Sequence, residues 1–265
     1  MQLYLTYVFA LFIGLSLGLT GGGGSILTVP VLVYIAKIEP IIATAYSLFI
    51  VGFASLVGAT GYLKKRMVNL KVSIVFAIPA FITVWLMRKF VIHAMPNILF
   101  TAGTFTLTRD LFLMLFFALI MFISGCKMIC DNKEEAVPKN SKAYYPLVLL
   151  SGITVGVLSG LVGAGGGFLI VPTLVFLMNL PMNKAVGTSL LVIAINSLIG
   201  FTGDILNLPK IDWYFLVIFS VIASVGVLLG TYLSRFINNE KLKKMFGFFV
   251  FAMAIVIVIE ELVFS

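Results

Sequence analysis

Two stretches decide the fold of this chain: GLTGGGGSILTVP at residues 18–30 and GLVGAGGGFLIVP at residues 160–172. The offset between them is 142 residues at both ends of the match. Without gaps, Ala43, Ser47, Leu48, Ser55, Leu56, Gly58, Thr60 and Gly61 pair with Ala185, Ser189, Leu190, Ser197, Leu198, Gly200, Thr202 and Gly203. Over residues 18–61 roughly 18 of 44 positions are identical, more than shared apolar composition explains, so the chain is a duplicated unit.

The composition is that of a membrane protein. Of the 265 residues, 61% are hydrophobic and 11% charged, and the mean hydropathy is +1.17. A soluble domain is about a quarter charged. Roughly 20 apolar residues cross the hydrocarbon of a bilayer. Six runs are long enough, or nearly so, to be single spans: 41–63, 70–87, 111–126, 185–203, 213–234 and 245–259.

The fold class expected from these runs is all-α, a polytopic transmembrane helical bundle. Lipid offers the backbone no hydrogen-bond partners, so spans are helices or closed barrels, and the runs lack the alternation of barrel strands. Two more apolar regions, 3–36 and 147–180, are too long and too broken to be single spans. The first residues have no basic segment and no small-residue cleavage site, so we expect the first segment to remain in the mature protein.

A charged linker at 127–145 separates a first repeat, 1–126, from a second repeat, 146–265. Each repeat reads as a glycine-broken hairpin followed by three spanning helices. Because three crossings are an odd number, the second copy would be inserted upside down relative to the first. The prediction is therefore a pair of inverted-topology repeats.

The basic residues agree with this inversion, because loops rich in lysine and arginine face the cytoplasm. Four basic residues crowd 64–71, whereas the matching loop 206–212 balances Lys210 against Asp212. The next loop of the second repeat, 235–244, again holds four basic residues against one acid. This predicts a multi-pass protein of the cell membrane with both termini outside and the linker cytoplasmic. Four residues would lie on the outer side of the membrane in this orientation, contrary to the rule: Arg88, Lys89, His93 and Arg109.

The charge and the cysteines exclude other functions. The net charge of +8 is spread over short loops without a contiguous patch, so no nucleic-acid partner is expected. Cys126 and Cys130 have no partner histidines, and we interpret them as packed thiols. With one histidine and almost no buried acids, no catalytic residue, metal or cofactor is expected. The expected partners are the lipid bilayer and a small anionic substrate, and a homo-oligomer is left open.

The glycine-rich breaks predict two re-entrant hairpins. At about 1.5 Å per residue, segment 3–19 reaches roughly 25 Å and segment 25–36 roughly 18 Å, so the second cannot cross a core of about 30 Å. Turn 21–25 would lie at membrane depth, and turn 163–167 would enter from the opposite face. Inverted hairpins that meet near the midplane typically form a transporter's substrate site.

The helices that begin near Ser25 and Gly167 would aim their unpaired N–H groups and positive dipole ends at that space. Glycine lets the oxygens of an anion approach the backbone closely. The predicted substrate-binding residues of the turns are Gly22, Gly23, Gly24, Ser25, Gly165, Gly166 and Gly167. The alternative is helix packing, because small residues let membrane helices come close together.

A second polar cluster opens the span after each turn, at 44–47 and at 187–189. Its hydroxyls can complete an oxyanion shell, and the candidates are Ser47, Thr188 and Ser189. Further polar residues follow at helical spacing, namely Ser55, Thr60, Asn196, Ser197 and Thr202. Bonds to their own backbone or between helices explain these equally well.

Three other features have simpler interpretations. Asp204 is the acid most nearly embedded in an apolar run, and we place it at the interface, at the end of a span. His93 is expected in a surface loop. Residues 100–108, FTAGTFTLT, alternate between apolar and polar, which predicts an extended external element without a counterpart in the second repeat.

The twice-repeated G-x-x-G-x-G-G-G-like run with its proline, followed by an A-x-G-T-S-L-like run, resembles the sulfite exporter TauE/SafE family of membrane transporters. Residues 185–190, AVGTSL, match the second element closely, whereas residues 43–48, ATAYSL, have Ala45 and Tyr46 in place of Gly and Thr. The resemblance covers nearly the whole chain, omitting the linker and 88–110. It implies transport of sulfite, sulfonates or other small organic anions, without a known cofactor.

The leading hypothesis is a secondary transporter that moves a small anion by alternating access and holds it at midplane with helix N-termini. The alternative is a passive anion channel that uses the same glycine-rich hairpins as a filter. Both hypotheses place the anion at the glycine turns. They differ in whether the two repeats move around the bound anion.

Overall fold

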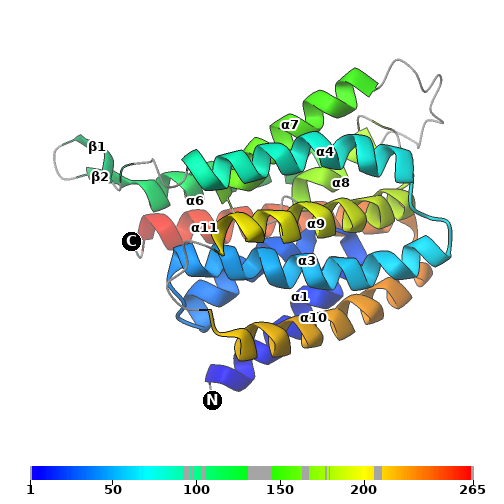
Figure 1. Cartoon of the computed structure of the whole chain (residues 1–265), viewed down its shortest axis with the longest axis horizontal. Coiled ribbons are helices and arrows are strands. Elements are labelled where there is room, and N and C mark those ends of the chain that lie inside the picture. Colours follow the sequence, from blue (N-terminus) through cyan, green and yellow to red (C-terminus); the bar gives the residue numbers. More distant parts are fainter. Residues whose placement is uncertain are drawn as a thin grey trace.

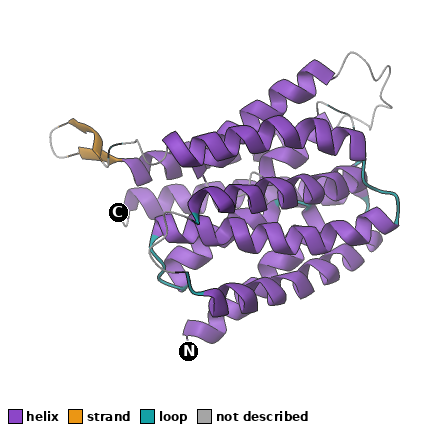
Figure 2. Cartoon of the chain, viewed as in Figure 1, coloured by secondary structure: helices purple, strands orange, loops and turns teal. Residues whose placement is uncertain are grey.

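The structure is a computed structural model, and it describes residues 2–91, 96, 98–102, 105–130, 145–162, 167–176, 178, 180–205 and 211–263. Helices dominate these residues (Figure 1, Figure 2). The helices are α1 (Gln2–Thr20), α2 (Gly23–Pro30), α3 (Pro40–Lys64), α4 (Leu70–Leu86), α6 (Arg109–Cys130), α7 (Tyr145–Val162), α8 (Gly167–Phe176), α9 (Met182–Asp204), α10 (Trp213–Leu233) and α11 (Asn239–Val263). Two π-helical segments, Val31–Ile35 and Met87–Val91, extend α2 and α4, and a 3₁₀ turn, Ser234–Phe236, follows α10.

The predicted membrane segments coincide with these helices. Each of the six single runs falls on one helix, and each broken region falls on a pair of shorter helices, α1 with α2 and α7 with α8. Four helices of the described part are long and apolar enough to cross a membrane: Ile41–Lys64, Leu70–Val91, Met182–Asp204 and Trp213–Leu233. The chain is therefore a helical membrane bundle, as the sequence predicts.

Helices α3 and α9 form the centre of the bundle. Of the most apolar stretch of each helix, 61% is buried inside the protein in α3 and 72% in α9, compared with 33% in α4. The two helices run antiparallel, because Gly58, late in α3, faces Leu190, early in α9, and Gly200, late in α9, faces Leu48, early in α3. The offset of 142 residues relates Gly58 to Gly200 and Leu48 to Leu190, so it converts each of these two contacts into the other.

Two outer pairs of helices also join segments far apart in sequence. Helix α1 lies along α10 and α7 lies along α4, both in parallel orientation. The closest approaches are at small residues: Gly14 and Gly18 face Ala223 and Val227, and Gly152, Gly156 and Gly160 face Phe76, Ala80 and Val84. Small residues let membrane helices approach until their backbones touch. The first helix of each predicted repeat thus packs on a helix of the other repeat.

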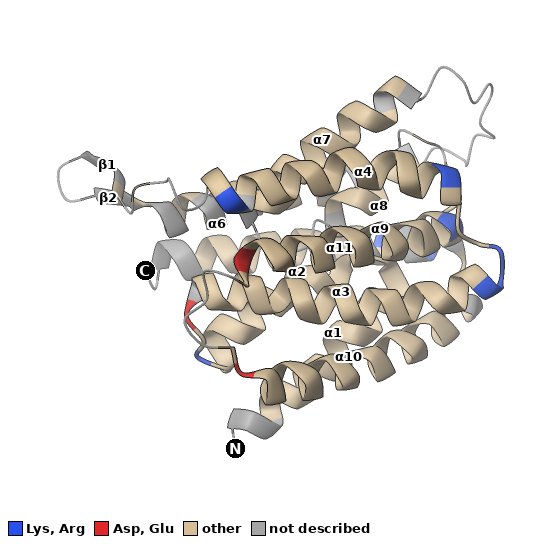
Figure 3. Ribbon diagram, viewed as in Figure 1, with Lys and Arg blue, Asp and Glu red and all other residues tan. Residues whose placement is uncertain are grey.

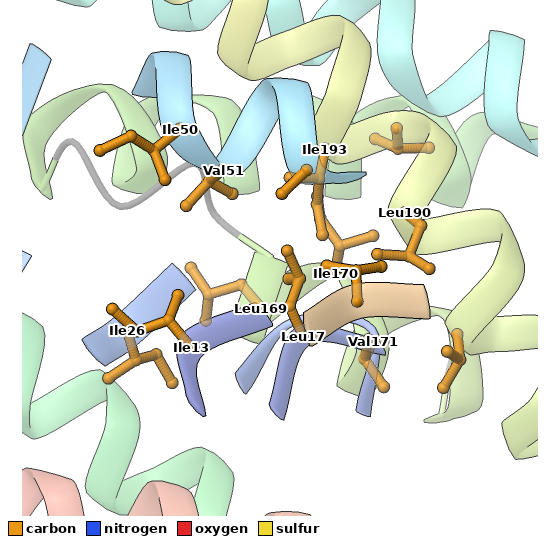
Figure 4. Packing of buried hydrophobic residues seen from close by; sticks show 14 of the residues in the cluster. Ile13, Leu17, Ile26, Ile50, Val51, Leu169, Ile170, Val171, Leu190 and Ile193 are labelled. Atoms are coloured by element: carbon orange, nitrogen blue, oxygen red, sulfur yellow. The ribbon is translucent and has the colours of Figure 1, made fainter. Parts of the chain in front are cut away.

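The buried apolar side chains form a continuous core between these layers. Figure 4 shows its central part, where Val51 of α3 and Ile193 of α9 lie in one cluster with Leu169 and Ile170 of α8. Ile26 of α2 belongs to the same cluster. The two short helices are therefore packed against the central pair.

A small antiparallel hairpin interrupts the helical pattern. Strand β1 (Ile98–Ala102) pairs with β2 (Phe105–Thr108), with Thr101 opposite Thr106. The extended element predicted at 100–108 is confirmed at 100–102 and 105–108, and within the described residues this hairpin is the one addition to an otherwise helical bundle. His93 lies outside the described residues.

Basic side chains gather at one end of the bundle (Figure 3). That end holds the loop between α3 and α4 and the starts of α9 and α11, with Lys64, Lys65, Arg66, Lys71, Lys184, Lys241 and Lys244. The opposite end carries a mixture of both signs, with Lys37, Glu39, Lys89, Asp204 and Asp212. The N and C marks in Figure 1 both lie toward this mixed end.

The parallel contact of α1 with α10 gives a stability prediction for Gly230→Val. A Cβ at Gly230 would overlap the Leu15 carbonyl oxygen and lie 2.9 Å from Leu19 N, and these backbone atoms cannot rotate away. We expect the free energy of unfolding in detergent to fall by about 1–3 kcal/mol, the usual effect of overpacking. The matched control is Gly61→Ala, whose Cβ would meet only Thr231 Cγ2, at 3.7 Å. Equal stability of the two variants would contradict the tight α1–α10 contact.

Candidate functional site

The first glycine turn connects α1 to α2. Gly21 has a φ of +72°, a left-handed conformation that suits glycine, and its N–H donates to the Leu17 carbonyl at 2.8 Å. A Cβ on Gly21 would lie 2.7 Å from Val186 Cα, so α9 approaches the turn closely. The predicted residues Gly22, Gly23, Gly24 and Ser25 follow, and all four are buried.

The start of α2 is partly capped by its own segment. Gly23 N–H donates to Thr20 Oγ1 at 3.0 Å, and Ser25 N–H donates to the Gly22 carbonyl at 3.2 Å. The Ser25 hydroxyl donates to the same Gly22 carbonyl at 2.7 Å. Gly24 N–H has no acceptor within the described residues. The amide of Gly24 is therefore an open donor at this helix start.

The start of α8 meets the start of α2. A Cβ on Gly167, the first residue of α8, would lie 3.0 Å from Ser25 Oγ, 3.1 Å from Gly22 Cα and 2.7 Å from Ile193 Cδ1. We call the residues Gly21–Ser25 together with Gly167 the turn junction. Gly165 and Gly166, also predicted as binding residues, lie outside the described residues.

The turn junction lies level with the middle of α9. Ile193, which touches Gly167, comes eleven residues after Met182 and eleven before Asp204, the two ends of α9. At about 1.5 Å per residue, it is roughly 16 Å from each end of a helix long enough to cross a membrane. Two helix N-termini, with their partial positive charge, are thus brought together at this depth.

All three predicted hydroxyls belong to the central helices and are fully buried, Ser47 on α3 and Thr188 and Ser189 on α9. Ser189 Oγ lies 2.8 Å from the Gly21 carbonyl and 2.8 Å from the Val186 carbonyl, so it ties α9 to the first turn. Ser47 Oγ has no hydrogen-bond partner within the described residues. The residue that the repeat places opposite Ser47, as Gly21 is opposite Ser189, is Gly163, which the structure does not describe.

The third predicted hydroxyl, Thr188, is engaged elsewhere. Thr188 Oγ1 accepts a hydrogen bond from the N–H of Asn69 at 3.1 Å, and Asn69 in turn caps α4 through Oδ1, which accepts from Val72 N–H at 3.2 Å. This bond holds α9 to the start of α4. Thr188 therefore contacts the loop before α4.

Tyr46 makes the equivalent bond at the opposite end of the bundle. Its hydroxyl accepts from the N–H of Asp212 at 2.7 Å, and Asp212 caps α10 through Oδ1, which accepts from Phe215 N–H at 3.0 Å. Tyr46 is the residue that replaces the family's threonine. That the longer tyrosine side chain preserves the hydroxyl contact could not be predicted from the sequence, because its partner lies 166 residues away.

The remaining polar residues divide into two groups. Thr60 and Thr202 donate to the carbonyls of Val57 and Ile199, as expected for hydroxyls in membrane helices. The unpartnered buried atoms of the described part are Ser47 Oγ, Ser55 Oγ, Ser159 Oγ, Asn196 Oδ1, Ser197 Oγ, Ser220 Oγ and Thr231 Oγ1. Asn196, for which backbone or interhelical bonds were an equally good expectation, belongs to this second group through its Oδ1.

The acidic and thiol groups that the structure describes do not gather into a second site. Asp204 is the last residue of α9, as predicted, but it is buried, with 6% of its surface exposed. Cys126 and Cys130 are free thiols on α6. Within the described residues, no group of three or more His, Cys, Asp or Glu side chains is placed to hold a metal ion.

The contact of Tyr46 with Asp212 predicts that Tyr46→Phe lowers the free energy of unfolding by about 0.5–1.5 kcal/mol, the net value of one hydrogen bond. The phenylalanine keeps the ring contact with Phe215, at a centroid distance of 6.3 Å, so only the hydroxyl is lost. Thermal or denaturant unfolding in detergent measures the change. Tyr214→Phe, at a side chain that is 78% exposed, is the control, and an equally small effect in both variants would refute this role of Tyr46.

Comparison with known proteins identifies the family. The family model described as "Sulfite exporter TauE/SafE" matches residues 6–257. A "Probable membrane transporter protein" of Xylella fastidiosa (strain 9a5c) is 29% identical over 252 residues, 93% of this chain and 91% of the relative. "Probable membrane transporter protein YunE" of Bacillus subtilis (strain 168) is 25% identical over 251 residues, 87% and 89% of the two chains.

A third relative, "Probable membrane transporter protein MJ0441" of Methanocaldococcus jannaschii, is 38% identical over 116 residues, 42% of this chain and 43% of the relative. The resemblance read from the glycine motifs is confirmed. The match to a family of membrane transporters is consistent with the expectation that the chain is not an enzyme. The chain belongs to the sulfite exporter TauE/SafE family and is a membrane transporter.

Proposed function

We propose that this transporter is a secondary carrier for a small anion, such as sulfite, a sulfonate or a related organic anion, and that it works by alternating access. The observation that carries the proposal is the turn junction, where Gly167 lies against Gly22 and Ser25 at the level of Ile193. Helix N-termini attract anions through their amides and their dipoles. The family description also names an oxyanion, sulfite.

The turn junction offers donors without side-chain charge. In this proposal the open amide of Gly24, in the junction, and the unpartnered hydroxyl of Ser47, on α3, both donate to an anion's oxygen. Gly22, Gly23 and Gly167 lack a Cβ, which leaves the backbone accessible at close range. The predicted donors Gly165 and Gly166 extend the same surface in this proposal. Ser25 and Ser189 shape the junction, because their hydroxyls bond to Gly22 and Gly21.

Alternating access follows from the proposed inverted repeats, 1–126 and 146–265, joined by the linker 127–145. The reciprocal contacts of Gly58 with Leu190 and of Gly200 with Leu48 support this relation, since a twofold axis across two antiparallel helices produces such pairs. The matching pairs α1–α10 and α7–α4 support it as well. Carriers built from inverted repeats open to either side as the repeats rock about a central site.

The proposed orientation places the basic end of the bundle in the cytoplasm. Lys64, Lys65 and Arg66 lie at that end, and lysine and arginine accumulate in cytoplasmic loops. Both ends of the described chain lie toward the opposite end (Figure 1). Both termini are therefore outside and the linker is cytoplasmic in this proposal.

The proposal predicts saturable uptake of radiolabelled sulfite by liposomes that contain the purified protein. It also predicts faster uptake when the liposomes are preloaded with unlabelled sulfite, because a carrier returns more quickly when loaded. Gly167→Val should abolish uptake, since its side chain would fill the space between the starts of α2 and α8. Gly61→Ala, outside the junction, should retain uptake.

Two results would contradict this account. Flux that rises linearly with concentration, without stimulation by preloaded sulfite, would indicate the passive anion channel instead. Full uptake by Gly167→Val would remove the turn junction from the transport path. Insertion of each variant is checked by its recovery in the liposome fraction, so loss of protein is not mistaken for loss of transport.

A further inference from the structure

One face of α9 points at the turn junction. Ser189 bonds to Gly21 on this face, and Ile193, four residues later, touches Gly167. Residues spaced by three or four lie on the same side of a helix. Asn196, three residues after Ile193 and seven after Ser189, therefore lies on the junction side of α9.

Asn196 is buried without a complete set of partners. Only 2% of its surface is exposed, and its Oδ1 has no hydrogen-bond partner within the described residues. Proteins leave few such groups unpaired in their interior, and an unpaired group indicates strain, a functional role or a missing ligand. The carboxamide can rotate by half a turn, which presents its two N–H donors in place of the oxygen.

Ser47 of α3 is a second unpartnered group on the corresponding helix. The repeat relates Ser47 to Ser189 and Val51 to Ile193, and Val51 and Ile193 lie in the same buried cluster (Figure 4). Ser47 is four residues before Val51, so it shares that face of α3. The two central helices thus each carry one open buried polar group, Asn196 on the junction side of α9 and Ser47 on the face of α3 that it shares with Val51.

No positive side chain accompanies these groups. Among the buried polar and charged side chains that the structure describes, Asp204 is the one that carries a formal charge, and it is an acid at the end of α9. The described lysines and arginines lie at the two ends of the bundle (Figure 3). The donors at the junction are therefore neutral amides and hydroxyls.

Neutral donors discriminate between ions by charge. The free energy needed to remove an ion from water rises with the square of its charge, so a dianion loses about four times as much hydration as a monoanion of similar size. Partial charges on helix N-termini amount to about half an elementary charge each, and two of them balance roughly one negative charge. A second negative charge would stay uncompensated.

We infer that the cargo is a singly charged oxyanion and that Asn196 is a cargo-binding residue that contributes a side-chain amide to it. The inference deepens the proposed function and rests on it. The residue of the first repeat that corresponds to Asn196 is Ala54, so the first repeat has no equivalent side-chain amide. The site is then asymmetric, with Asn196 on α9 and Ser47 on α3.

The first test compares methanesulfonate with sulfate on the wild-type protein in liposomes. The two ions are similar tetrahedral oxyanions that carry one and two negative charges. We expect methanesulfonate to inhibit the uptake of labelled sulfite at a concentration at least tenfold lower than sulfate does. Equal inhibition by the two ions would overturn the charge selection while leaving the carrier proposal intact.

The second test uses Asn196→Leu, which keeps the approximate volume and removes the amide. We expect the KM for labelled methanesulfonate to rise at least tenfold, with a Tm close to that of the wild type. Ser220→Ala is the matched control, because Ser220 is equally buried and unpartnered but lies on α10. Asn196→Leu with an unchanged KM would overturn the assignment of Asn196.

The two proposals fail in distinguishable ways. If the wild-type protein shows no saturable uptake of any tested anion, the carrier proposal fails and the inference fails with it. If the wild type transports sulfite but neither prefers methanesulfonate to sulfate nor depends on Asn196, only the inference fails. The comparison of ions does not require a variant, so it stands even if Asn196→Leu does not fold.

Discussion

The contact between the starts of α2 and α8 is the constraint on which the rest of the structure depends. A helix that ends inside a membrane leaves amides that lipid cannot satisfy, so such ends survive only when protein or water surrounds them. Gly167 lies against Gly22 and Ser25 because none of the three places a bulky group between the two helix starts. The central helices α3 and α9 then enclose this contact, which explains why they are the most buried of the four candidate spans.

Two side-chain bonds tie each central helix to the helix that follows the other central helix in the chain. Thr188 accepts from Asn69, the cap of α4, and Tyr46 accepts from Asp212, the cap of α10. The bonds lie at opposite ends of the bundle and join opposite repeats. They stabilise the frame around the turn junction without contributing to it, so the predicted substrate contact of Thr188 has the weakest structural support of the three hydroxyls.

Much of this architecture could be predicted from the sequence, because hydrophobic length and glycine breaks are local signals. The six spans, the two broken regions and the segment at 100–108 are each set by a pattern within one contiguous stretch of sequence. The partners of Tyr46, Thr188 and Gly230 could not be predicted in this way. Their contacts join segments more than 100 residues apart, and hydropathy is the same whichever helix lies opposite.

The candidate site was predictable to a similar extent. Glycine-rich turns predicted where the helices break, and the structure places the beginnings of both short helices together. It did not follow from the pattern that Thr20 and Ser25 would cap part of the first turn, or that Gly24 would keep an open amide. Asn196 was visible in sequence, and its spacing from Ser189 was the signal that could have ranked it higher.

The most direct test of the central claim is a disulfide between Ser25→Cys and Gly167→Cys, with Cys126 and Cys130 replaced by serine and a protease site inserted within 131–144. A Cβ at Gly167 would lie 3.0 Å from Ser25 Oγ, a separation compatible with a disulfide. After mild oxidation and cleavage, the two fragments should migrate as one band without reductant and as two with it. The control pair Gly61→Cys with Gly167→Cys should always separate. Separation of the Ser25–Gly167 pair without reductant would contradict the account, because the two helix starts would then not meet.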